Sequence, residues 1–277
     1  MSDWQSETID RGGRPMFVYR TAPGRPVLLL IHGYTDSGRS WQRLAEELAD
    51  QYTVLAPDLF GHGQSARLDG PTPMATFVDD LLALLADEGA EQVAVGGHSM
   101  GGVLAAALAA RLPGQVGALI LEDPAWVIHE TPAPEYFGNA DWGRDWREWI
   151  VELRALSREK MLAAIAEPTE GFAPLDRDIY LADRLDFDLA IFDWLDFSLR
   201  RGWRDHLQTQ TAPLLLVTGD PARGGIIHDD FAAEIFGLNG GGERLHVPAA
   251  GHGIHREAYE AFRDGVVAFL GRHFPGA

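Results

Sequence analysis

A serine stands at the centre of the stretch of sequence with the clearest chemical pattern. Residues 97–102 read Gly-His-Ser-Met-Gly-Gly, between an apolar run and an alanine-rich segment. The pattern glycine-x-serine-x-glycine between a strand and a helix predicts a sharp turn that presents Ser99 as a nucleophile. Gly97, Gly101 and Gly102 leave the space that such a turn needs. A serine at the start of a helix is also well placed for chemistry that develops negative charge.

The histidines supply candidates for the base, which a serine nucleophile requires because a hydroxyl attacks poorly at neutral pH. Of the ten histidines, His252 is favoured because it follows the last predicted strand in a glycine-rich loop. His255 begins a predicted helix, and we expect it at the surface or behind the site. His32 and His98 lie in other predicted turns, where packing and hydrogen bonding are their expected roles.

Near-continuous apolar runs alternate with amphipathic stretches along most of the chain. Such runs predict buried parallel strands, and the alternation predicts an α/β domain with helices on both faces of the sheet. Segments 6–10 and 15–20 predict an antiparallel hairpin before the first of these strands. The predicted strands are 27–31, 53–56, 92–96, 117–121, 213–218 and 243–247, and the predicted helices are 41–49, 74–85, 101–112 and 257–270.

The alternation stops between Asp123 and His206. This segment has helical patterns over 142–157 and 178–199 and holds six of the eight tryptophans. Ligands of parallel sheets bind at the carboxyl ends of the strands. We therefore expect residues 123–206 to form a helical cap over that edge. Residues 1–122 and 207–277 would then form the core domain.

The chain resembles the α/β-hydrolase superfamily in four motifs that occur in the family's order. His32-Gly33-Tyr34 resembles the oxyanion loop, Asp58–Ser65 the D-x-x-G-x-G-x-S turn, residues 97–102 the nucleophile elbow, and Gly251-His252 the C-terminal histidine motif. The resemblance implies an α/β-hydrolase fold: a mostly parallel central sheet with helices on both faces and a helical cap inserted before the last core strands. A serine at the elbow also separates the chain from epoxide hydrolases and haloalkane dehalogenases, which have aspartate there.

Two aspartates compete for the acid that orients His252 in a catalytic triad. The family position favours Asp220, just after the predicted strand 213–218, although its spacing from Gly219 departs from the common pattern. Asp123, after the preceding predicted strand, is the alternative. The chain order serine, aspartate, histidine fits both.

The resemblance also implies an oxyanion hole made of two backbone amides. The residue after the nucleophile, Met100, and the residue after His32-Gly33, Tyr34, would donate them. The ring of Tyr34 could instead, or in addition, line the pocket.

Aromatic residues of the predicted cap have two interpretations. Those at helical spacing, Trp142, Trp146 and Trp149, are typical of a stripe that packs the cap on the core, but some could wall an apolar substrate pocket. The pocket candidates are Trp126, Tyr136, Phe137, Trp142, Trp146 and Phe192.

Composition excludes several classes of protein. The chain of 277 residues has a formal charge of −18, which argues against binding to nucleic acid or to anionic membranes. It has no cysteine, which excludes disulfides, a cysteine nucleophile and thiolate zinc sites. We expect no metal and no cofactor, since the sequence has neither metal-ligand spacing nor a glycine-rich phosphate-binding loop. Without a leader-like N-terminal pattern, the chain is expected to be cytoplasmic, as a monomer or small homo-oligomer.

The sequence thus predicts a serine hydrolase of the carboxylesterase or lactonase type, acting on a small-to-medium, largely apolar ester or lactone. The expected cap carries 18 acidic and 10 basic residues, so its entrance should favour neutral or cationic substrates. A carbon–carbon bond hydrolase or a perhydrolase with the same triad is the alternative. Arg144, Arg147 and Arg154 favour the first of these, because its substrate is anionic. A non-catalytic ligand-binding protein is a further alternative.

Overall fold

The computed structural model describes residues 4–126 and 142–276, and its centre is one sheet of eight strands. These strands are β1 (Gln5–Asp10), β2 (Pro15–Arg20), β3 (Val27–Ile31), β4 (Thr53–Pro57), β6 (Val93–His98), β7 (Val116–Glu122), β9 (Leu214–Gly219) and β10 (Glu243–Val247). Across the sheet they follow the order β1-β2-β4-β3-β6-β7-β9-β10. The strands from β4 to β10 in this order run parallel, whereas β1 and β2 pair antiparallel. The predicted parallel sheet and starter hairpin are thereby confirmed.

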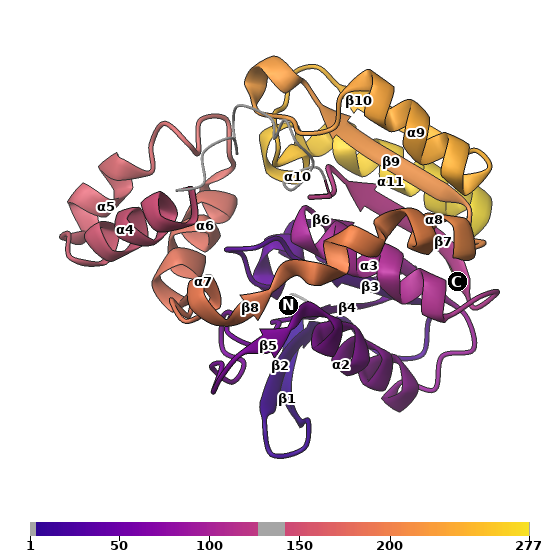
Figure 1. The fold of residues 1–277 in the computed structure, drawn as a ribbon, viewed down its shortest axis with the longest axis horizontal. Coiled ribbons are helices and arrows are strands. Elements are labelled where there is room, and N and C mark those ends of the chain that lie inside the picture. Colours follow the sequence, from indigo (N-terminus) through magenta and orange to yellow (C-terminus); the bar gives the residue numbers. More distant parts are fainter. Residues whose placement is uncertain (1–3, 127–141, 277) are drawn as a thin grey trace.

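Helices cover both faces of the sheet, as Figure 1 shows. One face carries α2 (Met74–Asp87), α3 (Met100–Arg111), α8 (Trp203–Thr209) and α9 (Asp229–Asn239), and the other carries α1 (Gln42–Leu48), α10 (Ile254–Glu257) and α11 (Tyr259–His273). Alternation along the strands makes both cores possible: Leu29 and Ile31 of β3 belong to the first core, while Leu28 and Leu30 belong to the second. All four are buried, as expected for a strand covered on both sides.

The chain between β7 and β9 leaves the sheet and forms mainly helices. These are α4 (Trp142–Arg154), α5 (Arg158–Ala164), α6 (Pro174–Asp186), α7 (Ile191–Trp194) and the 3₁₀ helix η4 (Phe197–Gly202). Figure 1 shows α4, α5 and α6 grouped to one side of the sheet, whereas α8 runs beside α3. The group has a small core of its own, to which Leu153, Ile165 and Tyr180 belong. That a cap domain extends over residues 123–206 remains a prediction.

A second, two-residue strand pair ties the end of this insertion back to the core. It joins β5 (Thr72–Pro73), at the start of α2, to β8 (Leu195–Asp196), which follows α7. The helix α9 was not among the predicted elements, because only Phe231, Ala232 and Ile235 of its residues are buried. None of the described helices is long and apolar enough to span a membrane.

Candidate active site

Ser99 lies on the turn between β6 and α3. Its backbone has φ 54° and ψ −115°, a combination that residues other than glycine rarely adopt. A Cβ atom added to Gly97 would lie 2.2 Å from the carbonyl oxygen of Gly101, so the turn closes only with glycine at this position. The amide of Ser99 donates to the carbonyl of Glu122 at 2.9 Å, which ties the turn to β7. The predicted strand–turn–helix context is therefore present.

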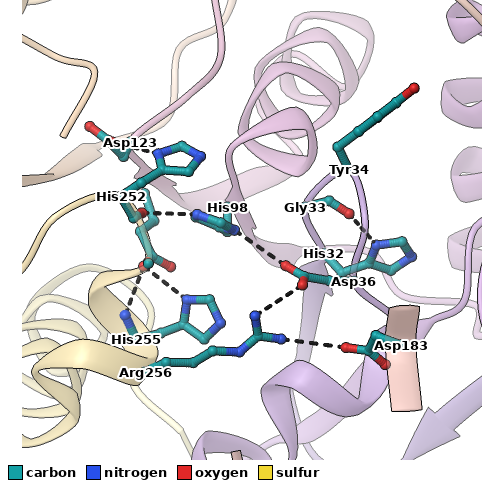
Figure 2. A network of polar contacts seen from close by, with 12 residues as sticks. His32, Gly33, Tyr34, Asp36, His98, Asp123, Asp183, His252, His255 and Arg256 are labelled. Atoms are coloured by element: carbon teal, nitrogen blue, oxygen red, sulfur yellow. Dashed lines mark hydrogen bonds and ion pairs between the residues drawn. The ribbon is translucent and has the colours of Figure 1, made fainter. Parts of the chain in front are cut away.

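Asp123 and His252 meet at the carboxyl ends of the strands. The Nδ1 atom of His252 lies 2.7 Å from Oδ2 of Asp123, and Figure 2 shows the two side chains. Asp123 is fully buried, and its carboxylate also accepts from the amides of Ile226 at 2.9 Å and Ile227 at 3.2 Å. Burial alone would lower the pKa of His252, but the hydrogen bond and negative charge of Asp123 raise it above its ordinary value.

The side chain of Asp220, the acid that the family position favours, binds another partner in the structure. Asp220 caps the short 3₁₀ helix η5 (Pro221–Arg223), and its Oδ1 accepts from the amide of Ala222 at 2.9 Å. The physical reason is that η5 starts at the next residue, so the Asp220 side chain caps this helix by accepting from an amide within it. The loop that follows supplies the amides of Ile226 and Ile227 to Asp123 instead. Geometry therefore pairs His252 with the alternative acid, Asp123.

The loop after β3 is held by two buried histidines. Nε2 of His32 accepts from the amide of Leu59 at 3.0 Å, so its Nδ1 carries the proton and donates to the carbonyl of Gly33 at 2.8 Å. Burial lowers the pKa of His32 to about 3, in keeping with this neutral ring. Nε2 of His62 donates to the carbonyl of Tyr34 at 2.7 Å. The carbonyls of residues 33 and 34 are thus fixed by side chains from within the protein.

A cavity of about 340 Å³ opens beside Ser99 and His252. Its volume lies near the lower end of the range for small-molecule sites. Tyr34 lines it from the loop after β3, and aromatic and charged side chains line it from the inserted helices. The lining residues are Tyr34, Thr35, Asp36, His98, Ser99, Ala125, Trp146, Glu167, Pro168, Glu170, Phe172, Tyr180, Arg184, Arg223, His252, Gly253, Arg256 and Glu257.

Comparison with known families decides the assignment. The family model described as alpha/beta hydrolase fold matches residues 26–166, about half of the chain. The chain belongs to the α/β hydrolase fold family. The resemblance and the fold class predicted from the four motifs are thereby confirmed.

Among its relatives, this α/β hydrolase is 46% identical to lipase LipV of Mycobacterium tuberculosis over 111 residues. That match covers 40% of this chain and 42% of LipV, so the chain spans less than half the length of this relative. It is 29% identical over 248 residues to 2-succinyl-6-hydroxy-2,4-cyclohexadiene-1-carboxylate synthase of an Enterobacter species, covering 85% and 88% of the two chains. The thioesterase domain from the curacin biosynthetic pathway shares the fold, with a TM-score of 0.75, 21% identity and coverage of 95% and 99%.

The predicted pocket aromatics take different places in this α/β hydrolase. Trp146 lines the cavity, whereas Trp126 is buried and stacks on Trp203 at a ring-centroid distance of 5.0 Å. Phe192 packs edge-on against the ring of Tyr34 at 5.6 Å and is not among the lining residues. Tyr136 and Phe137 lie outside the described residues. Trp142 is the first residue of α4, and its side chain is not described.

Four buried charged residues form a cluster, of which Asp36, Arg184 and Arg256 line the cavity; part of the cluster is drawn in Figure 2. Nη1 of Arg256 donates to Asp36 at 2.9 Å, and Nη1 of Arg184 donates to the same carboxylate at 3.2 Å. Burial would raise the pKa of Asp36, but the guanidinium of Arg256, aided by His98 and Arg184, holds it well below its usual range. Asp183 lies 3.5 Å from Arg256, and burial together with Asp36 raises its pKa to about 6.

Glu122, the residue before Asp123, forms a second acid–histidine pair with His255. Oε1 of Glu122 accepts from the amide of His255 at 2.8 Å and lies 2.9 Å from Nδ1 of the same residue. Burial raises the pKa of Glu122 to about 7 and lowers that of His255 to about 3. Among the described residues, His98, Glu122 and His255 are the group whose side-chain atoms could meet a metal ion, within 4.8 Å of one another. His255 already satisfies Glu122 Oε1, whereas Glu122 Oε2, His98 Nδ1 and His255 Nε2 are buried without a hydrogen-bond partner in the described part of the chain.

Several cavity residues were not predicted from the sequence. Arg144 and Arg147, two of the arginines considered for an anionic substrate, are exposed and paired with Asp145 and Asp193. The third, Arg154, donates to the carbonyl of Arg184. Arg184 and Arg256 line the cavity instead. The sequence offered some indication that Arg256 lies near the site, because it follows the candidate base His252 by four residues. Nothing in the acidic stretch around Arg184 indicated that this residue would line the cavity.

Proposed function

We propose that this α/β hydrolase is a serine hydrolase of the carboxylesterase type that cleaves a small-to-medium, largely apolar ester or lactone through an acyl-enzyme. One observation carries the proposal: Asp123 bonds His252 at 2.7 Å beside a cavity that also holds Ser99 on its strained turn. The kinship with LipV, a lipase by name, supports ester hydrolysis in general.

In the proposed first step, Oγ of Ser99 attacks the carbonyl carbon of the ester. The Nδ1 proton of His252 is directed to Asp123, so Nε2 is the atom that accepts the proton of Ser99. The same Nε2 then returns the proton to the leaving alcohol as the bond between the carbonyl carbon and the alcohol oxygen breaks. Asp123 stabilises the imidazolium that exists between these two transfers.

The proposed oxyanion hole consists of the amides of Tyr34 and Met100. Met100 is the first residue of α3, where the partial positive charge of the helix favours an oxyanion. The loop of Tyr34 is held in place by His62 through the Tyr34 carbonyl. Water then attacks the acyl-enzyme with His252 as base, which releases the acid and restores Ser99.

We also propose that neutral or cationic substrates are preferred over anionic ones. Two exposed carboxylates, those of Glu167 and Glu170, line the cavity, against one exposed cation, Arg223. The buried arginines do not offset this, because Arg184 and Arg256 are already paired with Asp36. The cavity volume of about 340 Å³ suits an ester of modest size rather than a long acyl chain.

A second candidate is carbon–carbon bond hydrolysis of an anionic dienoate by the same three residues. Arg184 and Arg256 on the cavity wall favour it, as does the relationship to a cyclohexadiene-carboxylate synthase. Perhydrolase chemistry, in which hydrogen peroxide replaces water, would use the same acyl-enzyme. Because the arginines face aspartates, ester hydrolysis remains the proposal.

The test is hydrolysis of p-nitrophenyl acetate and butyrate, beside a lactone, a dienoate and a peroxide-dependent assay. Replacing Ser99 by alanine should lower kcat on the order of 10⁶-fold while the fold is retained. Ser198→Ala is the matched control, because Ser198 is exposed and bonds Asp196 in the insertion. Full activity of the Ser99→Ala variant would refute the assignment of the nucleophile. Turnover of the dienoate alone would favour the second candidate.

A further inference from the structure

The backbone on both sides of His252 is bound by one carboxylate. Oε2 of Glu257 accepts from the amide of Gly251 at 2.6 Å, and Oε1 accepts from the amide of Gly253 at 2.9 Å. The side chain of Glu257 therefore spans His252 from the residue before it to the residue after it. Hydrogen bonds from amides to an ionised carboxylate are stronger than those between neutral groups.

The carbonyl of His252 is bound by a second side chain, that of His98. Nε2 of His98 lies 2.9 Å from this oxygen, as drawn in Figure 2. A carbonyl oxygen only accepts, so Nε2 of His98 carries the proton and donates it. His98 immediately precedes Ser99 and is the last residue of β6. One hydrogen bond thus joins the backbone of the proposed base to the neighbour of the proposed nucleophile.

The surrounding backbone allows this loop little freedom. A Cβ atom added to Gly251 would lie 2.1 Å from the carbonyl oxygen of Arg223, and one added to Gly219 would lie 1.8 Å from that of Gly251. The amide of Asp220 also donates to the carbonyl of Ala250 at 2.7 Å. The loop is therefore closely packed on the end of β9, and Glu257 binds two of its amides.

We propose that Glu257 is a positioning residue for His252, and that it works together with His98 to set the ring of His252 against Ser99. Asp123 fixes the Nδ1 end of the ring, but the direction of Nε2 also depends on the backbone that carries it. Misplacement of a catalytic group by about 1 Å can cost about 10²-fold in rate. The proposal rests on the proposed function, since it assigns Glu257 a role in the same reaction.

The kinetic test compares Glu257→Ala and Glu257→Gln with the wild-type chain on p-nitrophenyl butyrate. We expect kcat to fall about 10²-fold in Glu257→Ala with little change in KM. The kcat of Glu257→Gln should lie between those of Glu257→Ala and the wild-type chain, because its amide group offers one acceptor oxygen in place of two. Glu257 also lines the cavity, so a raised KM with unchanged kcat would mean substrate contact and would overturn the proposal.

Asp188 provides a matched control for the loss of such a carboxylate. It is half-buried like Glu257, and its two oxygens accept from the amides of Ala190 and Leu68, each at 3.0 Å, away from the cavity. Asp188→Asn should leave kcat unchanged even if stability falls. An equal loss of kcat in both variants would indicate a general effect on folding and would contradict the proposal.

A spectroscopic measurement separates this proposal from the proposed function. The Nδ1 proton of His252, bonded to Asp123, should give a downfield proton resonance that His252→Ala removes. We expect Glu257→Ala to shift or broaden it, and Asp188→Asn to leave it unchanged. An unchanged resonance in Glu257→Ala would overturn the positioning role, even if the wild-type chain proved inactive on every ester. If Glu257→Ala fails to fold, Glu257→Gln, which keeps the size of the side chain but offers one acceptor oxygen in place of two, carries the same test.

Discussion

The carboxylate of Asp123 lies 2.7 Å from the imidazole of His252, and the backbone of Asp123 has a strained φ of 41°. Among the described residues other than glycine, Asp123 and Ser99 have positive φ. Ser99 lines the cavity, and Asp123 binds His252, which lines it too. Strained backbone of this kind persists where surrounding contacts hold it and is concentrated at functional sites. The amides of Ile226 and Ile227 provide such contacts for Asp123.

The identity of the acid can be tested with a pair of substitutions. Asp123→Asn should lower kcat about 10⁴-fold, because the amide no longer favours the tautomer of His252 that accepts a proton from Ser99. Asp220→Asn should leave kcat nearly unchanged, since Asp220 caps η5. Steady-state kinetics on p-nitrophenyl butyrate measure both. The opposite order of effects would restore Asp220 as the acid.

The pH dependence of kcat/KM should report the environment of His252. A general base must be neutral to accept a proton, so activity falls as the pH drops through the pKa of His252. Because Asp123 raises that pKa, the acid limb should lie above the ordinary histidine value of 6.5. Residual activity of Asp123→Asn should show an acid limb at lower pH, because the largest contributions that raise the pKa of His252 against burial are those of Asp123. A wild-type limb well below the ordinary value would contradict this expectation.

Glu122 should make stability depend on pH. Burial raises its pKa from 4.5 to about 7, so the folded chain keeps a proton that the unfolded chain loses between these values. The stabilisation is complete below the unfolded pKa and is lost as the pH rises through the folded pKa. Glu122→Gln keeps an acceptor for His255 and cannot ionise. Its Tm relative to wild type should therefore rise between about pH 5 and about pH 8. A constant difference in Tm would show that Glu122 is ionised throughout.

The buried charge cluster should be costly to break. Replacing Arg256 by methionine leaves Asp183 without this cation and Asp36 with one arginine in place of two, and should lower the free energy of unfolding by about 3–5 kcal/mol. Arg147→Met is the control, because its pair with Asp193 is exposed and such pairs contribute about 0–1 kcal/mol. Urea unfolding of both variants measures the difference. Similar losses would mean that burial of the cluster does not matter.

Substrate charge should affect kcat/KM in the direction set by the exposed carboxylates that line the cavity. Cationic and neutral esters of equal size should be turned over faster than anionic ones, and added salt should reduce the contrast. Glu167→Gln and Glu170→Gln should reduce it as well, since both residues line the cavity. Competition between matched esters at low and high salt measures the effect. Fastest turnover of the anionic ester at low salt would contradict it.

Much of the core could be predicted from sequence because its signals are local. The run Val27–Ile31 predicted a buried strand, which is β3, and the glycines around Ser99 predicted the turn between β6 and α3. The aromatic residues of the insertion were harder, because a tryptophan that packs on another helix and one that walls a cavity share the same spacing. Trp149, which packs edge-on against Trp146, and Trp146, which lines the cavity, illustrate the two outcomes.

The sequence by itself determined the family, the serine turn and the candidate base, since each depends on residues adjacent in the chain. Only the tertiary structure decided which aspartate meets His252, because that depends on how the loop after β9 turns. There Asp220 is drawn to η5 and the next amides go to Asp123. Tertiary structure likewise brought Arg184 and Arg256, 72 residues apart in the sequence, onto one carboxylate at Asp36. No local pattern encodes such a contact, because it arises when separate elements pack together.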